Sequence, residues 1–424
     1  MLQSASENAL KNLAKQNELV DIFCKLVTFD TQALAKSQTV PSSAGQLELG
    51  AYLRDFLQNL GYETYIDDKG LVKTFVAASE GCENAKGLCL LAHLDTAPDA
   101  SGKNVKPRLV EHFSSKEGIK LDNGLVIDSN ICPKLFEHLG DDIIVTDGTT
   151  LLGADDKAGV AIIVKLLKTL KEHPEIKHGP LCAVFTVDEE LGTSTSHIKP
   201  DEFKCEYGIT IDGSNLGELD VATFNASKAC VNFRGISVHT AVAYKAMVNA
   251  TSLVAKFMSL LPSTQRPETT YGKEGFYHIY NIQGQVENAC VELILRDFDE
   301  NKLKEREDFV KECAKFINKS VGYEACSVVI TPQYKNLAQA LKANPEILDL
   351  CHKAFKDANV EVVENSVRGG TDGSNLSYRG LPCPNIFMGA LNCHGPYECL
   401  PIKAFSKSYE ITLALVKRMA ETSK

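Results

Sequence analysis

Four apolar runs, each of which ends in an acid or a histidine, constrain the fold of this chain most strongly. The runs are "GLCLLAHLD" at 87–95, "LCAVFTVDEE" at 181–190, "EYGITIDG" at 206–213 and "NIFMGALNCHG" at 385–395. Longer segments with helical periodicity separate them, and this alternation predicts a three-layer α/β fold with a mostly parallel sheet. Ligands bind outside the carboxyl ends of the strands in such sheets, so we expect the side chains that follow the four strands to share one crevice.

The middle of the chain has a different texture. The apolar pattern there predicts six elements, namely a strand at 227–239, a helix at 246–261, strands at 276–285 and 288–299, a helix at 305–318 and a strand at 325–334. This βαββαβ order predicts an inserted ferredoxin-like α+β domain. We therefore expect a catalytic domain in two parts, 1–221 and 336–424, with the inserted domain at 222–335.

Composition excludes several classes of protein. With 424 residues, 44% of them hydrophobic, the chain can form more than one packed unit. Its net charge of -10 argues against nucleic acid or an anionic membrane as a partner. We find no secretory leader and no apolar run long enough to span a bilayer. The 14 cysteines are scattered without a C-x-x-C pair, which predicts reduced thiols and a cytoplasmic protein.

Two adjacent aspartates, Asp155 and Asp156, stand in "LLGADDKAGV" at 151–160. The apolar spacing of Ile162, Leu166 and Leu170 predicts a helix that begins directly after them. An aspartate at the start of a helix accepts hydrogen bonds from unpaired backbone N–H groups. One aspartate is enough for that capping role, so the second requires another explanation.

Two further groups of polar residues follow predicted strands. In "HLD", His93 and Asp95 are two residues apart on an extended chain and can therefore lie on the same side. An imidazole that binds a metal commonly donates its other N–H group to a carboxylate, although a histidine at a strand end is also a common structural residue. The acids of "DEE", at 188–190, fit either a metal site or a solvated turn.

A crevice that held His93, Asp155, Asp212, His394 and the acids at 188–190 would concentrate negative charge. Such carboxylates repel one another unless a cation lies between them. Carboxylates together with imidazoles suit zinc, with manganese or cobalt as possible substitutes. The number of carboxylates indicates two ions per chain, one carboxylate that bridges them and a second that serves as the general base.

Six short runs in this sequence resemble a known family. They are "LLAHLDTAPD", "TLLGADDKAG", "FTVDEELG", "TIDGSNLGELD", "VRGGTDGSNLS" and "NCHGPYE". Their order and wording are similar to those of the di-zinc exopeptidase family, which includes the tripeptide aminopeptidases of the peptidase T type, aminoacylases and glutamate carboxypeptidases. The resemblance extends over nearly the whole chain and implies a metal-dependent hydrolase.

The resemblance assigns a role to each residue of the expected crevice. Asp155 would bridge two zinc ions, and the peptide bond to Asp156 would be cis. The remaining roles are as follows: ligands of the first ion, His93 and Asp212; ligands of the second ion, Glu190 and His394; general base, Glu189; partner of His93, Asp95.

The inserted domain resembles the lid and dimerisation domain of the same family. His239, in "VHTA", is at the position of the lid histidine that reaches the substrate oxyanion. The family commonly has V-H-P-G there, and this departure leaves the histidine in place. The resemblance also implies a homodimer formed through the inserted domain.

Two arginines and an asparagine are candidates for binding a peptide substrate. Arg296 and Arg368 each carry a planar guanidinium that matches a carboxylate. For Arg296, a surface ion pair with Asp297 or Asp299 is an equal alternative. Asn281, in "YNIQGQ", fits either a substrate contact or a hairpin turn.

The function predicted from these observations is that of a zinc-dependent aminopeptidase that releases the N-terminal residue from tripeptides. A related di-zinc amidohydrolase or carboxypeptidase acting on N-acyl amino acids or dipeptides is the alternative, because the metal motifs do not determine specificity. A metal-binding scaffold without catalytic activity is disfavoured by Glu189, since a purely structural site has no need of a carboxylate that is not a ligand.

Overall fold

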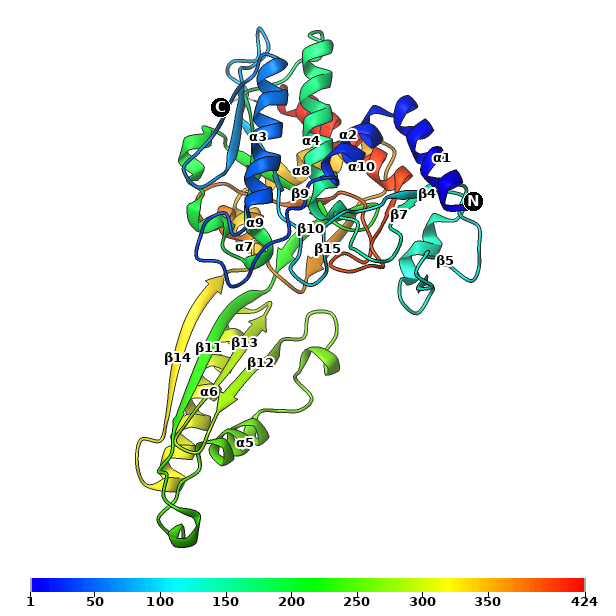
Figure 1. Cartoon of the computed structure of the whole chain (residues 1–424). Coiled ribbons are helices and arrows are strands. Elements are labelled where there is room, and N and C mark those ends of the chain that lie inside the picture. Colours follow the sequence, from blue (N-terminus) through cyan, green and yellow to red (C-terminus); the bar gives the residue numbers. More distant parts are fainter. Residues whose placement is uncertain (1, 423–424) are drawn as a thin grey trace. The chain divides into compact units, whose positions relative to one another are not determined.

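The computed structural model describes residues 2–422, which divide into two compact units. The first unit contains the chain up to Val221, Gln339–Asn365 and the chain from Thr371 onward. The second, here called the inserted unit, contains Ala222–Ala338 and Ser366–Gly370. Figure 1 draws most of the inserted unit in green and yellow.

An eight-stranded sheet forms the centre of the first unit, in the order β1-β2-β8-β3-β9-β16-β10-β15. The strands in chain order are β1 Glu63–Ile66, β2 Val72–Val76, β3 Leu88–His93, β8 Leu181–Thr186, β9 Tyr207–Gly213, β10 Glu218–Thr223, β15 Val363–Val367 and β16 Asn385–Phe387. The four neighbours β8, β3, β9 and β16 are parallel to one another. They correspond to the four apolar runs of the sequence, and the predicted α/β fold class is confirmed.

Smaller sheets complete the first unit. Three strands pair in the order β17-β7-β4 and two more, β5 and β6, pair with each other. Their bounds are β4 Arg108–Val110, β5 Ile119–Lys120, β6 Val126–Ile127, β7 Ile143–Val145 and β17 Cys399–Pro401.

Helices cover the central sheet (Figure 1). The α-helices of the first unit are α1 Leu2–Gln16, α2 Glu18–Leu26, α3 Ala44–Asn59, α4 Ala154–Glu172, α7 Ala338–Ala343, α8 Pro345–Asp357, α9 Asp372–Tyr378 and α10 Ile402–Met419, of which α1 packs on α2 and β4 instead. One face of the sheet packs against α9 through a cluster that includes Cys89, Leu91, Val184 and Leu376. Helix α4, which is almost wholly buried, contacts β3 and also packs against α2 and α10.

The inserted unit has the predicted βαββαβ order. Its elements are β11 Asn225–Arg234, α5 Ala250–Leu260, β12 Phe276–Gly284, β13 Asn288–Asp297, α6 Glu300–Val321 and β14 Cys326–Tyr334. The strands form an antiparallel sheet in the order β12-β13-β11-β14, which is the ferredoxin-like arrangement. Both helices pack on this sheet around a core that includes Val231, Phe257, Leu293 and Ile317.

Residues 366–370 differ from the expected domain limits, because they group with the inserted unit rather than with the returning part of the catalytic domain. Arg368 explains this grouping, since its guanidinium lies over the rings of Phe224 and Phe276, at 5.3 and 5.4 Å from their centroids.

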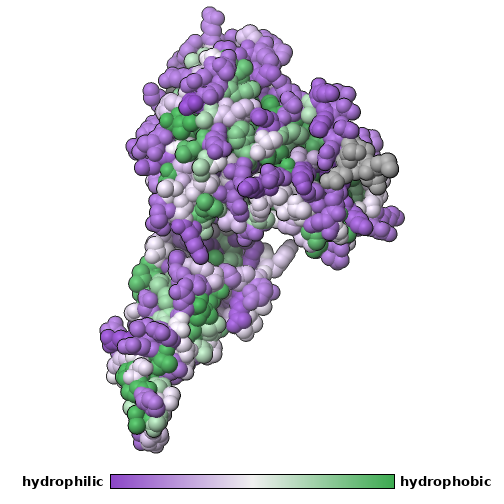
Figure 2. Space-filling view, in the orientation of Figure 1, coloured by the Kyte–Doolittle hydropathy of each residue, from purple (hydrophilic) through white to green (hydrophobic). Residues whose placement is uncertain are grey.

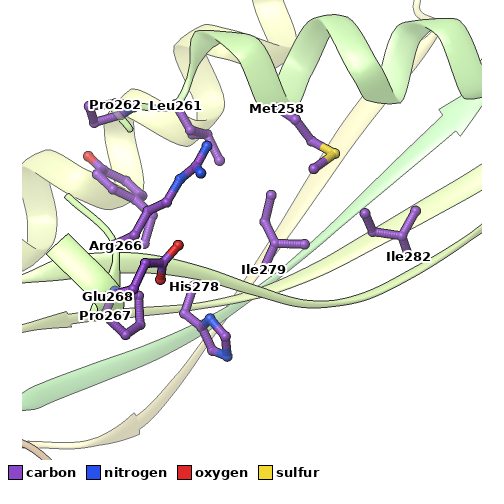
Figure 3. A pocket seen from close by; sticks show the side chains of 10 residues that line it. Met258, Leu261, Pro262, Arg266, Pro267, Glu268, His278, Ile279 and Ile282 are labelled. Carbon is purple, nitrogen blue, oxygen red and sulfur yellow. The ribbon is translucent and has the colours of Figure 1, made fainter. Parts of the chain in front are cut away.

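A pocket of about 220 Å³ lies in the inserted unit between the end of α5 and the strand β12. Figure 3 shows its lining, in which Met258, Leu261, Ile279 and Ile282 supply apolar side chains. Charged and polar groups stand beside them on residues 266–268 and at His278.

The surface seen in Figure 2 is mostly hydrophilic, with apolar side chains in separate patches. None of the helices within residues 2–422 combines the length and the apolar character needed to span a membrane.

Candidate metal centre

Five predicted ligands meet at the carboxyl ends of the parallel strands. His93 is the last residue of β3, Asp212 lies near the end of β9, and Glu190 follows β8 in a short 3₁₀ turn. Asp155 lies at the start of α4, and His394 lies in the turn that follows β16. Parallel strands bring these residues together because their carboxyl ends share one edge of the sheet.

Asp155 lies at the centre of this cluster. Its Oδ1 accepts a hydrogen bond from Nε2 of His93 at 3.0 Å, and its Oδ2 accepts one from Nε2 of His394 at 3.1 Å. The two imidazoles therefore face opposite oxygens of a single carboxylate. This is an arrangement that a bridging carboxylate would require.

The other two carboxylates lie beside the imidazoles. Asp212 Oδ1 is 3.6 Å from Nε2 of His93, and Glu190 Oε1 is 3.2 Å from Nε2 of His394. Two sets of three donor atoms, His93–Asp155–Glu190 and His93–Asp156–Asp212, each lie within 4.8 Å of one another. Within the described chain, these are the groups compact enough to hold a metal ion.

Asp95 links His93 to the acids that follow β8. Nδ1 of His93 lies 3.0 Å from the main-chain oxygen of Asp95 and 3.5 Å from its carboxylate. The same carboxylate accepts hydrogen bonds from the backbone N–H groups of Glu189 and Glu190, both at 3.1 Å. Asp95 therefore fixes one imidazole through its backbone and two neighbouring glutamates through its side chain.

The two adjacent aspartates have different contacts. Asp156 is fully buried and accepts hydrogen bonds from the backbone N–H groups of Gly159 and His93, both at 3.1 Å. The bond to Gly159 has the spacing of a helix cap, which agrees with the capping role expected for one aspartate of the pair. The peptide bond between Asp155 and Asp156 is cis, as the resemblance implied.

The expectation that a long strand ends near His394 is wrong. Strand β16 ends at Phe387, and the chain then turns through Gly389, Asn392 and His394, which all have positive φ angles. An extended strand cannot continue through such residues. The turn, rather than a strand end, presents His394 to Asp155.

The cluster has more negative charge than its basic residues can balance. Burial raises the pKa of Asp212 to about 7, and burial together with the charge of Asp372 raises the pKa of Glu189 well above its usual value. The carboxylates of Asp155 and Glu190 raise the pKa of His394 to about 11. Among the five predicted ligands, only the two imidazoles can carry positive charge, and they do so only when protonated. Metal ions stabilise a buried group of carboxylates of this kind.

The donor atoms fit a divalent ion. Tetrahedral zinc with bonds of about 2.0–2.1 Å places neighbouring ligand atoms roughly 3.3 Å apart, close to the distances around His93 and His394. Glu190 Oε1 is buried, and its contact with His394 Nε2 at 3.2 Å does not have the geometry of a hydrogen bond. A bound cation would satisfy this oxygen, and imidazole and carboxylate donors suit zinc, manganese or cobalt.

Sequence reasoning missed two buried acids next to the cluster. The carboxylate of Glu398 accepts backbone hydrogen bonds from Leu152, Gly153 and Asp155. Asp372 accepts hydrogen bonds from the hydroxyls of Thr186 and Ser194. Both acids lie in motifs that carry the family resemblance, "NCHGPYE" and "VRGGTDG", and that position was the available signal.

The remaining predicted residues lie in the inserted unit. His239 is exposed, and its Nδ1 accepts a hydrogen bond from Ala241 N at 3.2 Å. Asn281 lies within β12 at an irregularity in the pairing with β13, and its Nδ2 donates to Glu292 at 2.8 Å. The hairpin-turn explanation for Asn281 is therefore wrong, because the turn between the two strands follows Gly284.

The two arginines have most of their contacts within the inserted unit. Arg296 is buried and donates to Gln333 Oε1 at 2.9 Å, whereas Asp297 pairs with Arg306, so the alternative of a surface ion pair is wrong. Arg368 donates to the oxygens of Gly272 and Glu274 and to the Thr270 hydroxyl, at 2.7–2.9 Å. A guanidinium has five N–H groups, which leaves two on Arg368 for a ligand.

Comparison with known proteins agrees with the fold and the cluster. Residues 148–418 match the family model described as peptidase family M20/M25/M40. A peptidase T from Parabacteroides distasonis is 40% identical over 407 residues, which cover 96% of this chain and 100% of that protein.

Solved structures show the same architecture. A tripeptidase from Staphylococcus aureus has a TM-score of 0.74 at 22% identity, with 95% of this chain and 98% of that one covered. A dinuclear metal-binding M20 peptidase from Bacillus subtilis has a TM-score of 0.64 at 13% identity, with 96% and 98% covered. From the family model and the 40% identity, the chain belongs to peptidase family M20/M25/M40.

Proposed function

We propose that this protein is a metal-dependent aminopeptidase that releases the N-terminal residue from tripeptides. Its relatives at about 40% identity are named peptidase T, and they match 94–96% of the chain. The observation that carries the proposal is the placement of Glu189 beside the metal-binding cluster. Glu189 shares the lining of a small cavity with His93 and Asp212, and its backbone N–H group donates to Asp95.

Two divalent ions would be held by the residues that surround Asp155. Asp155 would bridge them, with His93 and Asp212 on one ion and Glu190 and His394 on the other. We propose zinc as the natural ion, since its preferred ligands are imidazole and carboxylate, with manganese or cobalt as substitutes. When bound, the pair supplies a Lewis acid for the peptide carbonyl and lowers the pKa of water.

Glu189 would act as the general base and then as the general acid. Burial and the nearby Asp372 raise its pKa, which suits a carboxylate that accepts a proton from water and returns it to the leaving amine. The carboxylate of Asp95 accepts a hydrogen bond from the backbone N–H group of Glu189 at 3.1 Å, and this bond fixes the backbone from which the Glu189 side chain extends. His239 would donate to the oxyanion of the tetrahedral intermediate.

Substrate binding would use the inserted unit. The two remaining N–H groups of Arg368 can donate to a peptide carboxylate. Arg296, which is buried, and Asn281, which donates to Glu292, remain weaker candidates.

We further propose a homodimer formed through the inserted unit. Among the described strands, β12 pairs on one side with β13, and its other edge has no partner strand. Tyr280 and Ile282 of β12 are 45% and 48% exposed, and Ile282 also lines the pocket of Figure 3. An edge strand beside apolar surface favours pairing with a second chain.

The free state of all 14 cysteines supports a cytoplasmic location.

The oligomer is tested separately from the activity, by sedimentation at micromolar concentration. A dimer is expected, and a monomer at every concentration would remove this part of the proposal.

A panel of three substrates tests the activity. Purified protein loaded with zinc is assayed on a tripeptide, on the same peptide acetylated at its N-terminus, and on an N-acyl amino acid. Release of the first residue from the free tripeptide is expected, with little activity on the other two. A preference for either acylated compound would replace the aminopeptidase with the amidohydrolase alternative.

A further inference from the structure

The segment that leads into the regular part of helix α4 is bent. Gly153 has a φ of 76°, and Asp155 and Asp156 have non-helical backbone angles, so the helical run that Asp156 caps through Gly159 begins only after them. Residues 151–154 are buried, so water does not reach the backbone N–H groups there. The N–H groups of Leu152, Gly153 and Asp155 lie before the regular hydrogen bonds of the helix, and a buried N–H group without a partner destabilises the fold. An acceptor from elsewhere in the chain is therefore needed.

Glu398 supplies that acceptor. Its Oε2 accepts hydrogen bonds from the backbone N–H groups of Leu152 and Gly153, both at 2.7 Å. Its Oε1 accepts one from the N–H group of Asp155 at 3.0 Å. Glu398 is 1% exposed, so these three bonds are shielded from water. One carboxylate thus holds the backbone of Asp155 and of the two residues that lead into the helix.

The backbone of Glu398 belongs to the turn that carries His394. Its N–H group donates to the oxygen of Gly395 at 3.1 Å, and the next residue, Cys399, exchanges two hydrogen bonds with Leu391 at 2.8 and 3.0 Å. These bonds close the turn between 391 and 399. The strand β17 then fastens the end of the turn to β7. Glu398 is therefore anchored at the base of the turn, four residues from His394.

We infer that Glu398 is a positioning residue that sets the carboxylate of Asp155 between His93 and His394. It fastens the backbone of Asp155 to the turn of His394, whose Nε2 is 3.1 Å from Asp155 Oδ2. The packing of helix α4 on β3, α2 and α10 does not itself join it to that turn, which lies 239 residues later in the chain, whereas the bonds of Glu398 do. This inference rests on the metal centre proposed above and adds a residue that acts through Asp155 rather than on the substrate.

Zinc affinity measures this role directly. Glu398→Gln removes one oxygen and places an NH₂ group against the N–H groups of residues 152–155, so one or more of the three bonds is lost. Loss of a residue that orients a metal ligand typically weakens metal binding by about 10- to 100-fold. Calorimetric titration of metal-free protein with zinc is expected to show that loss, and the absorption spectrum of the cobalt-loaded variant is expected to change.

Two further variants separate positioning from charge and from stability. Glu398→Asp keeps the charge but shortens the side chain, and it is expected to weaken zinc binding as Glu398→Gln does. Asp372→Asn removes a buried negative charge near the cluster without touching the backbone of Asp155 and is expected to have a smaller effect. Equal weakening by Asp372→Asn would mean that charge, not position, is responsible, and it would overturn the inference.

The outcomes also distinguish this inference from the proposed function. A wild-type protein that binds no zinc would contradict the proposed metal centre itself. A wild type that binds two ions, with unchanged affinity and cobalt spectrum in folded Glu398→Gln, would contradict only the role of Glu398. The melting temperature of each metal-free variant shows whether it is folded, and a variant that fails to fold is replaced by Glu398→Asp in the same titration.

Discussion

The two oxygens of Asp155 face two different imidazoles, His93 at 3.0 Å and His394 at 3.1 Å. The two histidines come from segments about 300 residues apart in the chain, and a single carboxylate connects them. This relationship gives Asp155 a function that helix capping does not explain.

The variant Asp155→Asn should therefore abolish peptide hydrolysis. An amide presents one oxygen and no negative charge, so it cannot bridge two cations. Activity on a tripeptide is expected to fall by at least about 10³-fold, together with a loss of bound zinc measured by elemental analysis. Full zinc content with full activity would show that Asp155 is not a bridging ligand.

Glu189→Gln should separate catalysis from metal binding. The expected loss in kcat is about 10²- to 10⁴-fold, since an amide cannot accept a proton from water, while zinc content stays at that of the wild type. Glu190→Gln is the matched control, because it alters the neighbouring carboxylate that contacts His394 and should lower zinc content. If Glu189→Gln loses metal instead, Glu189 is a ligand and the assignment of the two glutamates is wrong.

Lys73 tests the stability of the first unit away from the cluster. Its ammonium is 4% exposed and lies 2.9 Å from Asp67 and 2.8 Å from Glu202. Lys73→Ala removes both ion pairs and the packing of a buried side chain, but Asp67 and Glu202 are 16% and 41% exposed, so it should lower the free energy of unfolding by about 1–2 kcal/mol, measured by urea denaturation. Lys69→Ala, which removes an exposed pair with Asp68, is the control and should change little.

Asp220 predicts a pH-dependent difference in stability. Burial raises its pKa to about 6, although Asn385 and Asn365 donate hydrogen bonds to it. The carboxyl group of Asp220 binds its proton more tightly in the folded state than in the unfolded state. The stability that this protonation contributes is therefore lost as the pH rises from about 4 through 6.

Asp220→Asn cannot ionise. Its free energy of unfolding, relative to the wild type, should therefore increase by roughly 2 kcal/mol between pH 4 and pH 8, since each pKa unit corresponds to about 1.4 kcal/mol and part of the change lies below pH 4. A difference between the two proteins that does not change with pH would contradict the burial of a titrating carboxylate at this position.

Much of the fold could be predicted from sequence because the apolar pattern is strong where the sheet is buried on both faces. The runs that became β3, β8 and β9 are continuous. His93 and Asp212 lie at the ends of β3 and β9, and Asp95 and Glu190 lie in the short segments that follow β3 and β8. Parallel strands have continuous apolar sequences because helices cover both faces of the sheet.

The turn around His394 could not be predicted in the same way. Its apolar run continues past Phe387, but Gly389 has a φ of 104° and Asn392 one of 53°, and these angles depend on contacts with the surrounding chain. Glu398 was missed for a related reason. The sequence does not show whether an acidic residue is buried. The three backbone N–H groups that donate hydrogen bonds to Glu398 belong to residues about 240 positions earlier in the chain.

The most direct test of the two-ion centre is a titration of metal-free protein with zinc, followed at each step by the rate of hydrolysis of a tripeptide. The account predicts that calorimetry shows two equivalents bound per chain, that activity reaches its plateau only as both are bound, and that Asp155→Asn fails to bind the pair. Full activity at one equivalent, or in protein shown to be free of metal, would contradict it.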